Sequence, residues 1–167
     1  MFRNASRSLT TSEEVYEYAL TLLDRREHGE KELVQKLKRR CTSASLIREA
    51  VEKLKQYDLI NEKRYAIRVF EAWRGKKIYG KLHLQAELLK KQVDERFIPE
   101  ILDSLSEEEE RSRLEAAYRQ IVRRQDKKYD VSTDKGVAAL ARYFSGKGFG
   151  TSLVRLGLSM AKADREQ

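Results

Sequence analysis

The chain repeats one hydrophobic pattern three times, and this repeat constrains its fold more than any other feature. Gly29, Gly80 and Gly136 are separated by 51 and 56 residues, and each stands four residues before a leucine. The same two offsets relate four sets of apolar positions: Leu33, Leu84 and Leu140; Leu37, Leu88 and Phe144; Ile47, Ile98 and Val154; and Val51, Leu102 and Leu158. An internal period of this length is typical of proteins built from tandem structural units.

Composition indicates that these units are helical. The 167 residues include a single proline, Pro99, so few residues interrupt helices, and Ala, Leu, Glu, Lys and Arg are abundant. A hydrophobic content of 40% against 37% charged suits small units that each bury one face against a neighbour. We predict an all-α fold of three tandem three-helix repeats that form an elongated, curved solenoid.

Helix-start signals place the boundaries of the repeats. Thr11 with Glu14 and Ser106 with Glu109 have the spacing of a capping box, and Asn61 is a natural helix N-cap. Pro99 should lie in the first turn of a helix. The extra residues of the third repeat should lengthen its first helix or the following loop. The predicted organisation is an N-terminal tail (1–11), repeats at 12–60, 61–105 and 106–162, and a frayed C-terminal tail (163–167).

The residues that support most enzyme chemistry are scarce. Cys41 is the only cysteine, and His28 and His83 are the only histidines, so neither a disulfide nor a metal-ligand spacing occurs. We interpret Cys41 as a packing residue and His28 as a hydrogen-bonding residue at a helix end. No phosphate loop, nucleophile with a base, or carboxylate pair stands out. We therefore predict no catalytic, cofactor or metal site, no enzyme activity, and a soluble, cytoplasmic protein without membrane contact.

Two stretches resemble the RecX family of bacterial regulatory proteins. LLDRREHGEKELVQKL (22–37) is similar to the family's opening motif, and LKQYDLINEKRYA (54–66) to the linker between its repeats. Seven linker residues match that pattern: Leu54, Leu59, Ile60, Asn61, Glu62, Tyr65 and Ala66. The resemblance covers about residues 15–160. Where the family often has glycine, this chain has Tyr57 and Asp58 before the apolar pair, and RRCT and KKQV after the second helices.

The resemblance implies a function that periodicity alone does not. Family members bind the filament that the RecA recombinase forms on single-stranded DNA, and they commonly restrain strand exchange and coprotease activity. The expected partners are the RecA filament and single-stranded DNA, contacted directly or through the filament without sequence specificity. We expect the chain to be a monomer.

Basic residues recur at related places in the three repeats of a chain with net charge +8. Stacked repeats would align them into a positive stripe suited to phosphates. Tyr79, beside these cations, is a candidate for stacking on bases. The predicted contact residues are Lys38, Arg39, Arg40, Arg74, Lys76, Lys77, Tyr79, Lys81, Lys90, Lys91, Arg123, Arg124, Lys127 and Lys128.

Other interpretations remain open at this point. Lysine and arginine also occupy ordinary solvated helix ends, where they oppose the helix dipole. Trp73 continues the apolar spacing of Val69 and Phe70, which favours a core position over base stacking. The four glutamates at 107–110 suit a helix N-terminus. Besides a RecA regulator, a stand-alone helix-turn-helix-like DNA-binding protein or a helical adaptor would fit the sequence.

Overall fold

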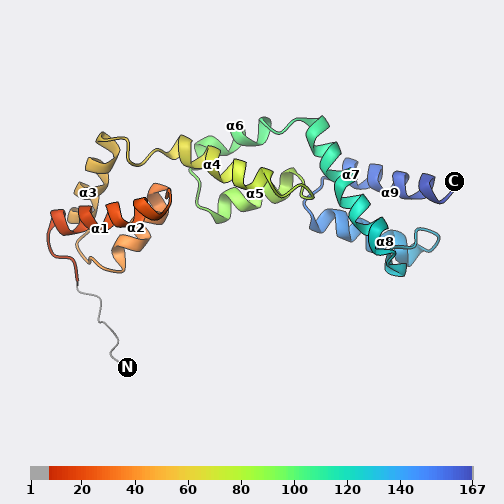
Figure 1. Cartoon of the computed structure of the whole chain (residues 1–167), viewed down its shortest axis with the longest axis horizontal. Coiled ribbons are helices and arrows are strands. Elements are labelled where there is room, and N and C mark those ends of the chain that lie inside the picture. Colours follow the sequence, from red (N-terminus) through yellow and green to blue (C-terminus); the bar gives the residue numbers. More distant parts are fainter. Residues whose placement is uncertain (1–7, 167) are drawn as a thin grey trace, which may run out of the picture. The chain divides into compact units, whose positions relative to one another are not determined.

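The computed structural model describes residues 8–166, and every regular element in that range is helical (Figure 1). The helices come in three sets of three, as predicted. The first set is α1 (Ser12–Arg25), α2 (Glu30–Lys38) and α3 (Ala44–Gln56). The second is α4 (Glu62–Arg74), α5 (Lys81–Lys90) and α6 (Ile98–Asp103), with the 3-10 turn η1 (Glu95–Phe97) before α6. The third is α7 (Glu107–Arg124), α8 (Asp134–Gly146) and α9 (Thr151–Arg165), with η2 (Lys127–Tyr129) before α8.

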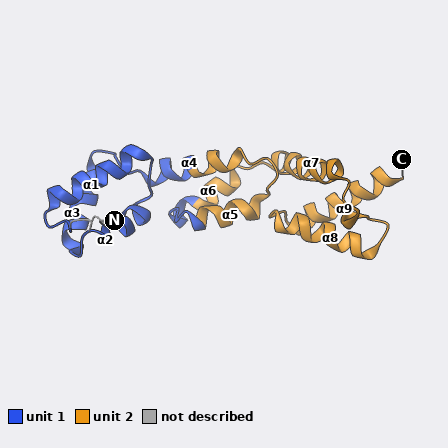
Figure 2. Cartoon of the chain, turned by 60° about the horizontal axis from the view of Figure 1, so that its bottom comes forward, with its two compact units in different colours: residues 1–68, 90–97 blue, residues 69–89, 98–167 orange. Residues whose placement is uncertain are grey.

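The chain forms two compact units, residues 1–68 with 90–97 and residues 69–89 with 98–167 (Figure 2). We call them unit 1 and unit 2. The predicted repeat boundaries at residues 60 and 105 fall in the turns before α4 and α7. That each repeat is a domain of its own stays a prediction, as does the curvature of the array.

The recurring apolar positions form the cores of these units. In unit 1, α1 packs on α2 and α3 around Leu33, Leu37 and Ile47, which are almost fully buried. In unit 2, Leu140 and Phe144 of α8 pack with residues of α7 and α9. The last of the repeated positions is weaker, because Val51 is buried whereas its two equivalents are half-buried. The helical period therefore predicted the core-facing side of most helices correctly.

The predicted helix starts are confirmed by their caps. The hydroxyl of Thr11 accepts from the backbone N–H of Glu14 at 3.2 Å, and that of Ser106 accepts from Glu109 at 3.1 Å. Asn61 caps α4 by accepting from the N–H of Arg64 at 2.9 Å. Pro99 is the second residue of α6, where a missing N–H costs no helical hydrogen bond. These caps satisfy backbone donors that a helix start otherwise leaves without partners.

The three recurring glycines are required for close packing. Gly29 directly precedes α2, and a Cβ there would come within 2.8 Å of the Tyr65 ring. Gly80 directly precedes α5. Gly136 differs from the expected position, because it is the third residue of α8 and Thr133 is the N-cap. A Cβ on Gly136 would overlap the carbonyl oxygen of Asp130, so the loop carrying η2 can lie directly on α8.

Two details of the third set depart from or refine the expectation. Its extra residues lengthen both the first helix, 18 residues in α7 against 13 in α4, and the loop that contains η2. The predicted fraying from residue 163 is wrong within the described range, because α9 continues to Arg165. The Tyr118 hydroxyl donates to the Asp164 carboxylate at 2.9 Å, which ties this last turn to α7.

Candidate nucleic-acid and partner interface

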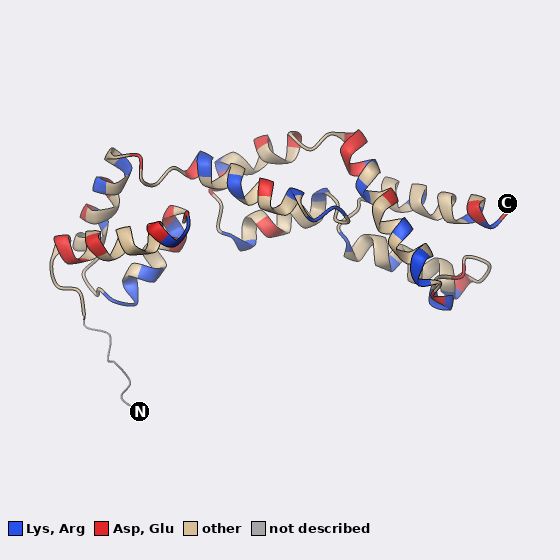
Figure 3. Ribbon diagram, in the orientation of Figure 1, with Lys and Arg blue, Asp and Glu red and all other residues tan. Residues whose placement is uncertain are grey.

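Basic residues lie on nearly every helix and are interspersed with acidic ones (Figure 3). In unit 1 the predicted contact residues are Lys38, Arg39, Arg40, Lys90 and Lys91. In unit 2 they are Arg74, Lys76, Lys77, Tyr79, Lys81, Arg123, Arg124, Lys127 and Lys128. A continuous stripe across the three repeats stays a prediction. Within each unit, however, the structure shows which of these residues share a surface.

Unit 1 has a shallow basic groove of about 280 Å³ between α2 and the turn that follows α5. We call it the α2 groove. It brings together residues more than 50 positions apart in the sequence. Its lining is Glu32, Gln35, Lys36, Arg39, Lys90, Lys91 and Gln92. Four cations thus surround a single carboxylate. Among residues 8–166, no carboxylate pairs with Arg39, Lys90 or Lys91, so their charges are available to a ligand.

The one carboxylate of the α2 groove is already neutralised. Glu32 accepts hydrogen bonds from both terminal nitrogens of Arg26 and lies 3.3 Å from the Lys36 ammonium. Burial alone would raise the pKa of Glu32, but the bonds and charges of Arg26 and Lys36 outweigh it and lower that pKa to about 2. Glu32 is therefore ionised and paired at neutral pH, and the groove presents net positive charge.

A buried histidine fixes the position of Lys36. The His28 Nε2 atom lies 2.7 Å from the Lys36 Nζ, and Nδ1 lies 2.9 Å from the backbone oxygen of Arg26. An ammonium can only donate and a carbonyl can only accept, so His28 is neutral with its proton on Nδ1. Burial lowers the pKa of His28, and the nearby positive charges of Arg26 and Lys36 act in the same direction. The expectation of a hydrogen-bonding histidine at a helix end is confirmed.

Tyr65 connects the two walls of the α2 groove. Its hydroxyl donates to the backbone oxygen of Lys91 at 3.1 Å and lies 3.5 Å from the Glu32 carboxylate. Burial, together with the negative charge of Glu32, raises the pKa of Tyr65 to about 12. The next residue of the turn, Gln92, has a left-handed backbone with φ of 56°. These contacts hold Lys90 and Lys91 opposite α2.

Arg40, although predicted as a contact residue, faces away from this groove's lining. Its guanidinium lies 5.0 Å from the centre of the Tyr18 ring, and its carbonyl accepts from the N–H of Leu9 at 2.7 Å. Lys38 is the exposed last residue of α2. Sequence reasoning included both residues because they belong to one basic run. It omitted Lys36 as a contact, although the Glu32 to Lys36 spacing of four is a recognisable helix pair.

Unit 2 has a second depression, of about 430 Å³, next to the C-terminus of α4. Its lining includes Arg74, Lys77 and Arg119, with Glu109 as the only carboxylate. Glu109 is shared, because it accepts from Arg74 at 2.8 Å and from Arg113 at 2.9 Å. This depression is therefore less positive than the α2 groove.

Arg113 is the residue of this region that sequence reasoning missed. It is 5% exposed and stacks its guanidinium 4.4 Å from the Trp73 ring centre. It also donates to the backbone oxygens of Arg74 and Lys76, at 2.9 and 3.0 Å, and so caps the end of α4. Trp73 is buried, which confirms the core interpretation over base stacking. Nothing local in the sequence distinguishes Arg113 from the exposed arginines of the same helix.

The other predicted contacts in unit 2 have mixed surroundings. The Tyr79 ring lies 4.0 Å from the His83 ring and beneath the Lys147 ammonium at 4.5 Å, so it already has stacking partners. Lys76 lies 3.9 Å from the Glu87 carboxylate. The basic cluster at the end of α7 and in η2 is exposed: Arg123, Arg124, Lys127 and Lys128.

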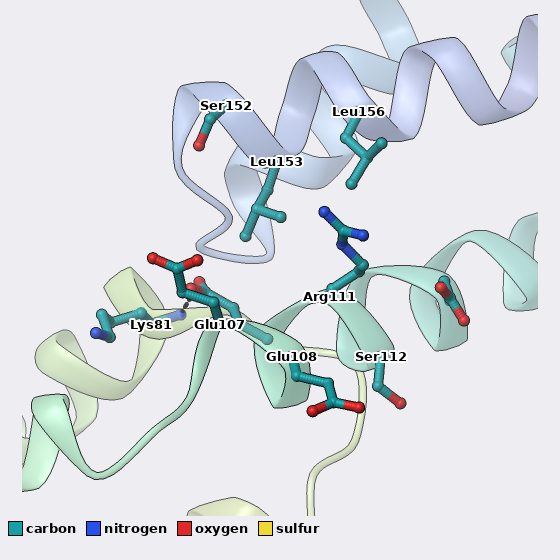
Figure 4. Close-up of a pocket in the computed structure, with 10 residues that line it drawn as sticks. Lys81, Glu107, Glu108, Arg111, Ser112, Ser152, Leu153 and Leu156 are labelled. Carbon is teal, nitrogen blue, oxygen red and sulfur yellow. Dashed lines mark hydrogen bonds between the residues drawn. The ribbon is translucent and has the colours of Figure 1, made fainter.

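Lys81 lies at the edge of an acidic depression of about 1060 Å³ (Figure 4). Glu107, Glu108 and Glu115 of α7 contribute to its lining, and Leu153 and Leu156 of α9 form its apolar side. The Glu110 carboxylate accepts from the backbone N–H of Lys81 at 2.7 Å, which caps the start of α5. The glutamate run thus has a structural role, and Lys81 has acidic neighbours.

Two negative observations apply to residues 8–166. No cluster of His, Cys, Asp and Glu there has the makings of a metal site. No helix in that range is both long enough and apolar enough to cross a membrane.

A model of the RecX first three-helix domain matches residues 16–54, which cover most of α1 to α3. Curated relatives and solved structures carry the same name. The regulatory protein RecX of Caldanaerobacter subterraneus is 29% identical over 149 residues, covering 89% of this chain and 71% of that protein. The chain belongs to the RecX family.

Other RecX proteins match over shorter lengths. The regulatory protein RecX of Chlorobium phaeobacteroides is 37% identical over 93 residues, which are 56% of this chain and 62% of that protein. The crystal structure of RecX from Lactobacillus salivarius superposes with a TM-score of 0.77 at 20% identity, covering 91% of this chain and 97% of that one. The structural match supports the three-helix repeats, and the names identify a RecX-type regulator.

The turns in which this chain departs from the common RecX pattern keep the backbone that glycine favours. Asp58 has φ of 52° and Gln92 has φ of 56°. Asp58 is supported by Asn61, which donates to its carboxylate at 3.0 Å, and by Arg64 at 2.9 Å. The α2 groove of this RecX chain therefore retains a sharp turn after α5 without a glycine.

Proposed function

We propose that this chain binds the RecA filament on single-stranded DNA and restrains its recombinase and coprotease activities. Membership of the RecX family supports the choice of partner. The α2 groove is the observation that carries the proposal for this chain. It offers cations without acidic partners on a surface held by His28, Tyr65 and Glu32.

The chemistry of the groove suits phosphates without reading bases. Lysine and arginine neutralise backbone phosphates and release counterions, so binding weakens as salt rises. Because the cationic side chains come from α2 and from the turn after α5, a phosphate in the groove would contact both. We propose that the groove contacts DNA in the filament and that the exposed cluster at the end of α7 adds weaker contacts.

The test is a matched pair of charge reversals in unit 1. Arg39→Glu with Lys91→Glu changes the groove, whereas Arg25→Glu with Arg48→Glu applies the same charge change to exposed residues outside its lining. Exposed ion pairs contribute about 0.2–1 kcal/mol each, and reversal replaces attraction with repulsion at two places. We expect the groove variant to need at least about tenfold more protein to inhibit strand exchange by RecA.

The control variant should inhibit within about threefold of the wild type, since it shares only the change in net charge. Equal loss in both variants would mean that net charge alone matters and would reject the groove as the contact. The alternative of a stand-alone DNA-binding protein makes a different prediction. Such a protein would inhibit RecA only at concentrations that saturate free single-stranded DNA, which fluorescence anisotropy measures directly.

A further inference from the structure

The exposed face of α5 is apolar where the equivalent helices are polar. Leu82 and Leu89 are 54% and 51% exposed, although they lie on a helix whose opposite side already buries Leu84 and Leu88. Ala86, also exposed, stands between them at the spacing that places all three on one side of a helix. We call Leu82, Ala86 and Leu89 the α5 stripe.

The internal repeat provides a comparison for this stripe. Shifted back by 51 residues, its three positions are Lys31, Gln35 and Lys38 of α2, all polar and exposed. Shifted forward by 56 residues, they are Ala138, Arg142 and Ser145 of α8. Exposed leucines contribute nothing to the helix that lysine does not, because both residues have high helix propensity. The apolar face is thus specific to the second repeat and is not required by the fold.

The ends of the stripe indicate what covers it. Lys81 directly precedes Leu82, and Lys90 directly follows Leu89, within the same helix. The nearest carboxylate of α5, that of Glu87, lies on another side of the helix and is within 3.9 Å of the Lys76 ammonium. A complementary surface would therefore carry apolar side chains between acidic ones. Nucleic acid fits poorly, because leucine offers neither charge nor a hydrogen bond to a phosphate.

We infer that the α5 stripe is a protein-docking surface that binds an apolar, acid-flanked segment of the partner protein in the filament. This inference rests on the proposed function and divides the binding between two surfaces. The α2 groove contacts phosphate and is sensitive to salt. The α5 stripe contacts protein through burial of apolar area, which salt screens little.

The experiment substitutes the residues that the first repeat already uses. Leu82→Lys with Leu89→Lys should keep the helix and its buried face, and Leu82→Ala with Leu89→Ala is a second variant without added charge. Ile67→Lys with Val122→Lys is the matched control, because it adds the same charge at apolar positions that are 42% and 50% exposed. Circular dichroism checks that helical content is unchanged.

Two probes separate the surfaces: free single-stranded DNA, and RecA filaments assembled on it. We expect the lysine variant to bind filaments at least about tenfold more weakly while binding free DNA as tightly as the wild type or more tightly. The alanine variant should lose about three- to tenfold on filaments. The control should bind filaments at least as well as the wild type.

Three results would overturn the inference in different ways. Unchanged filament binding by the lysine variant would remove the stripe from the interface and leave the proposed function intact. A wild-type chain that binds free DNA but not filaments would reject the proposed function and this inference together. A wild-type dimer in sedimentation that becomes a monomer in the lysine variant would assign the stripe to a second copy of the chain.

Discussion

Replacing Arg113 by methionine tests the account of how α4 and α7 are joined in unit 2. The guanidinium stacks on Trp73, donates to two backbone oxygens at the end of α4 and pairs with Glu109. Methionine keeps the length and the apolar contact with the indole, but it cannot donate a hydrogen bond. The variant therefore removes the charge and the cap while it leaves little empty volume.

The magnitude follows from the burial of this pair. Removing one partner of a buried ion pair typically destabilises by about 3–5 kcal/mol, since the other charge is left without compensation. Glu109 keeps a second partner here, because Arg74 donates to its carboxylate at 2.8 Å. The Glu109 side chain is also 23% exposed, so water can solvate it. We therefore expect a loss near the lower end of that range, about 3 kcal/mol.

Urea denaturation followed by circular dichroism measures this loss. Arg123→Met is the control, because Arg123 lies on the same helix and is exposed, and we expect it to change the free energy of unfolding by less than about 0.5 kcal/mol. Trp73 fluorescence should report loss of the indole environment at lower urea in the Arg113 variant. An Arg113→Met protein as stable as the control would refute the inference that this arginine stabilises the joint.

Three further predictions concern stability. Because the pKa of His28 is lowered from about 6.5 by folding, the unfolded chain binds its proton first, so stability should fall as pH drops below about 6.5; in urea titrations, His28→Gln should make this dependence shallower, and an unchanged slope would contradict the neutral, buried histidine. Gly136→Ala should destabilise by about 2 kcal/mol or more because its Cβ meets the Asp130 carbonyl, whereas Gly146→Ala, with open space around it, should be nearly neutral in the same thermal melts. Gln125→Gly should raise stability by about 0.5–1 kcal/mol, since residue 125 ends α7 with φ of 49°, and a lower melting temperature would argue against relief of backbone strain there.

Much of the fold was readable from the sequence because its signals are local. The spacing of Leu33, Leu37 and Ile47, repeated at two fixed offsets, identified the core-facing positions. The caps at Thr11 and Ser106 identified helix starts, because a capping hydroxyl bonds an N–H only three residues away. The family resemblance depended on such short stretches too, and the RecX domain match over residues 16–54 includes one of them.

The candidate interface was only partly readable, because its residues meet through packing. Charge runs identified Arg39, Lys90 and Lys91, but not that they line one groove held by Tyr65. Arg74 was a reasonable contact by sequence, yet in the structure it forms an ion pair with Glu109. Composition does not reveal which cations keep a free charge, because that depends on which carboxylates the fold brings within about 4 Å.

The sequence by itself determined the helices, their period of three and the side that each buries, because helix propensity, capping and apolar spacing act over a few residues. Only the tertiary structure decided the environment of each charge: Arg113 buried on Trp73, His28 neutral against Lys36, and the groove cations unpaired. The physical reason is that electrostatic free energy depends on burial and on distance in space, and residues far apart in the chain set both.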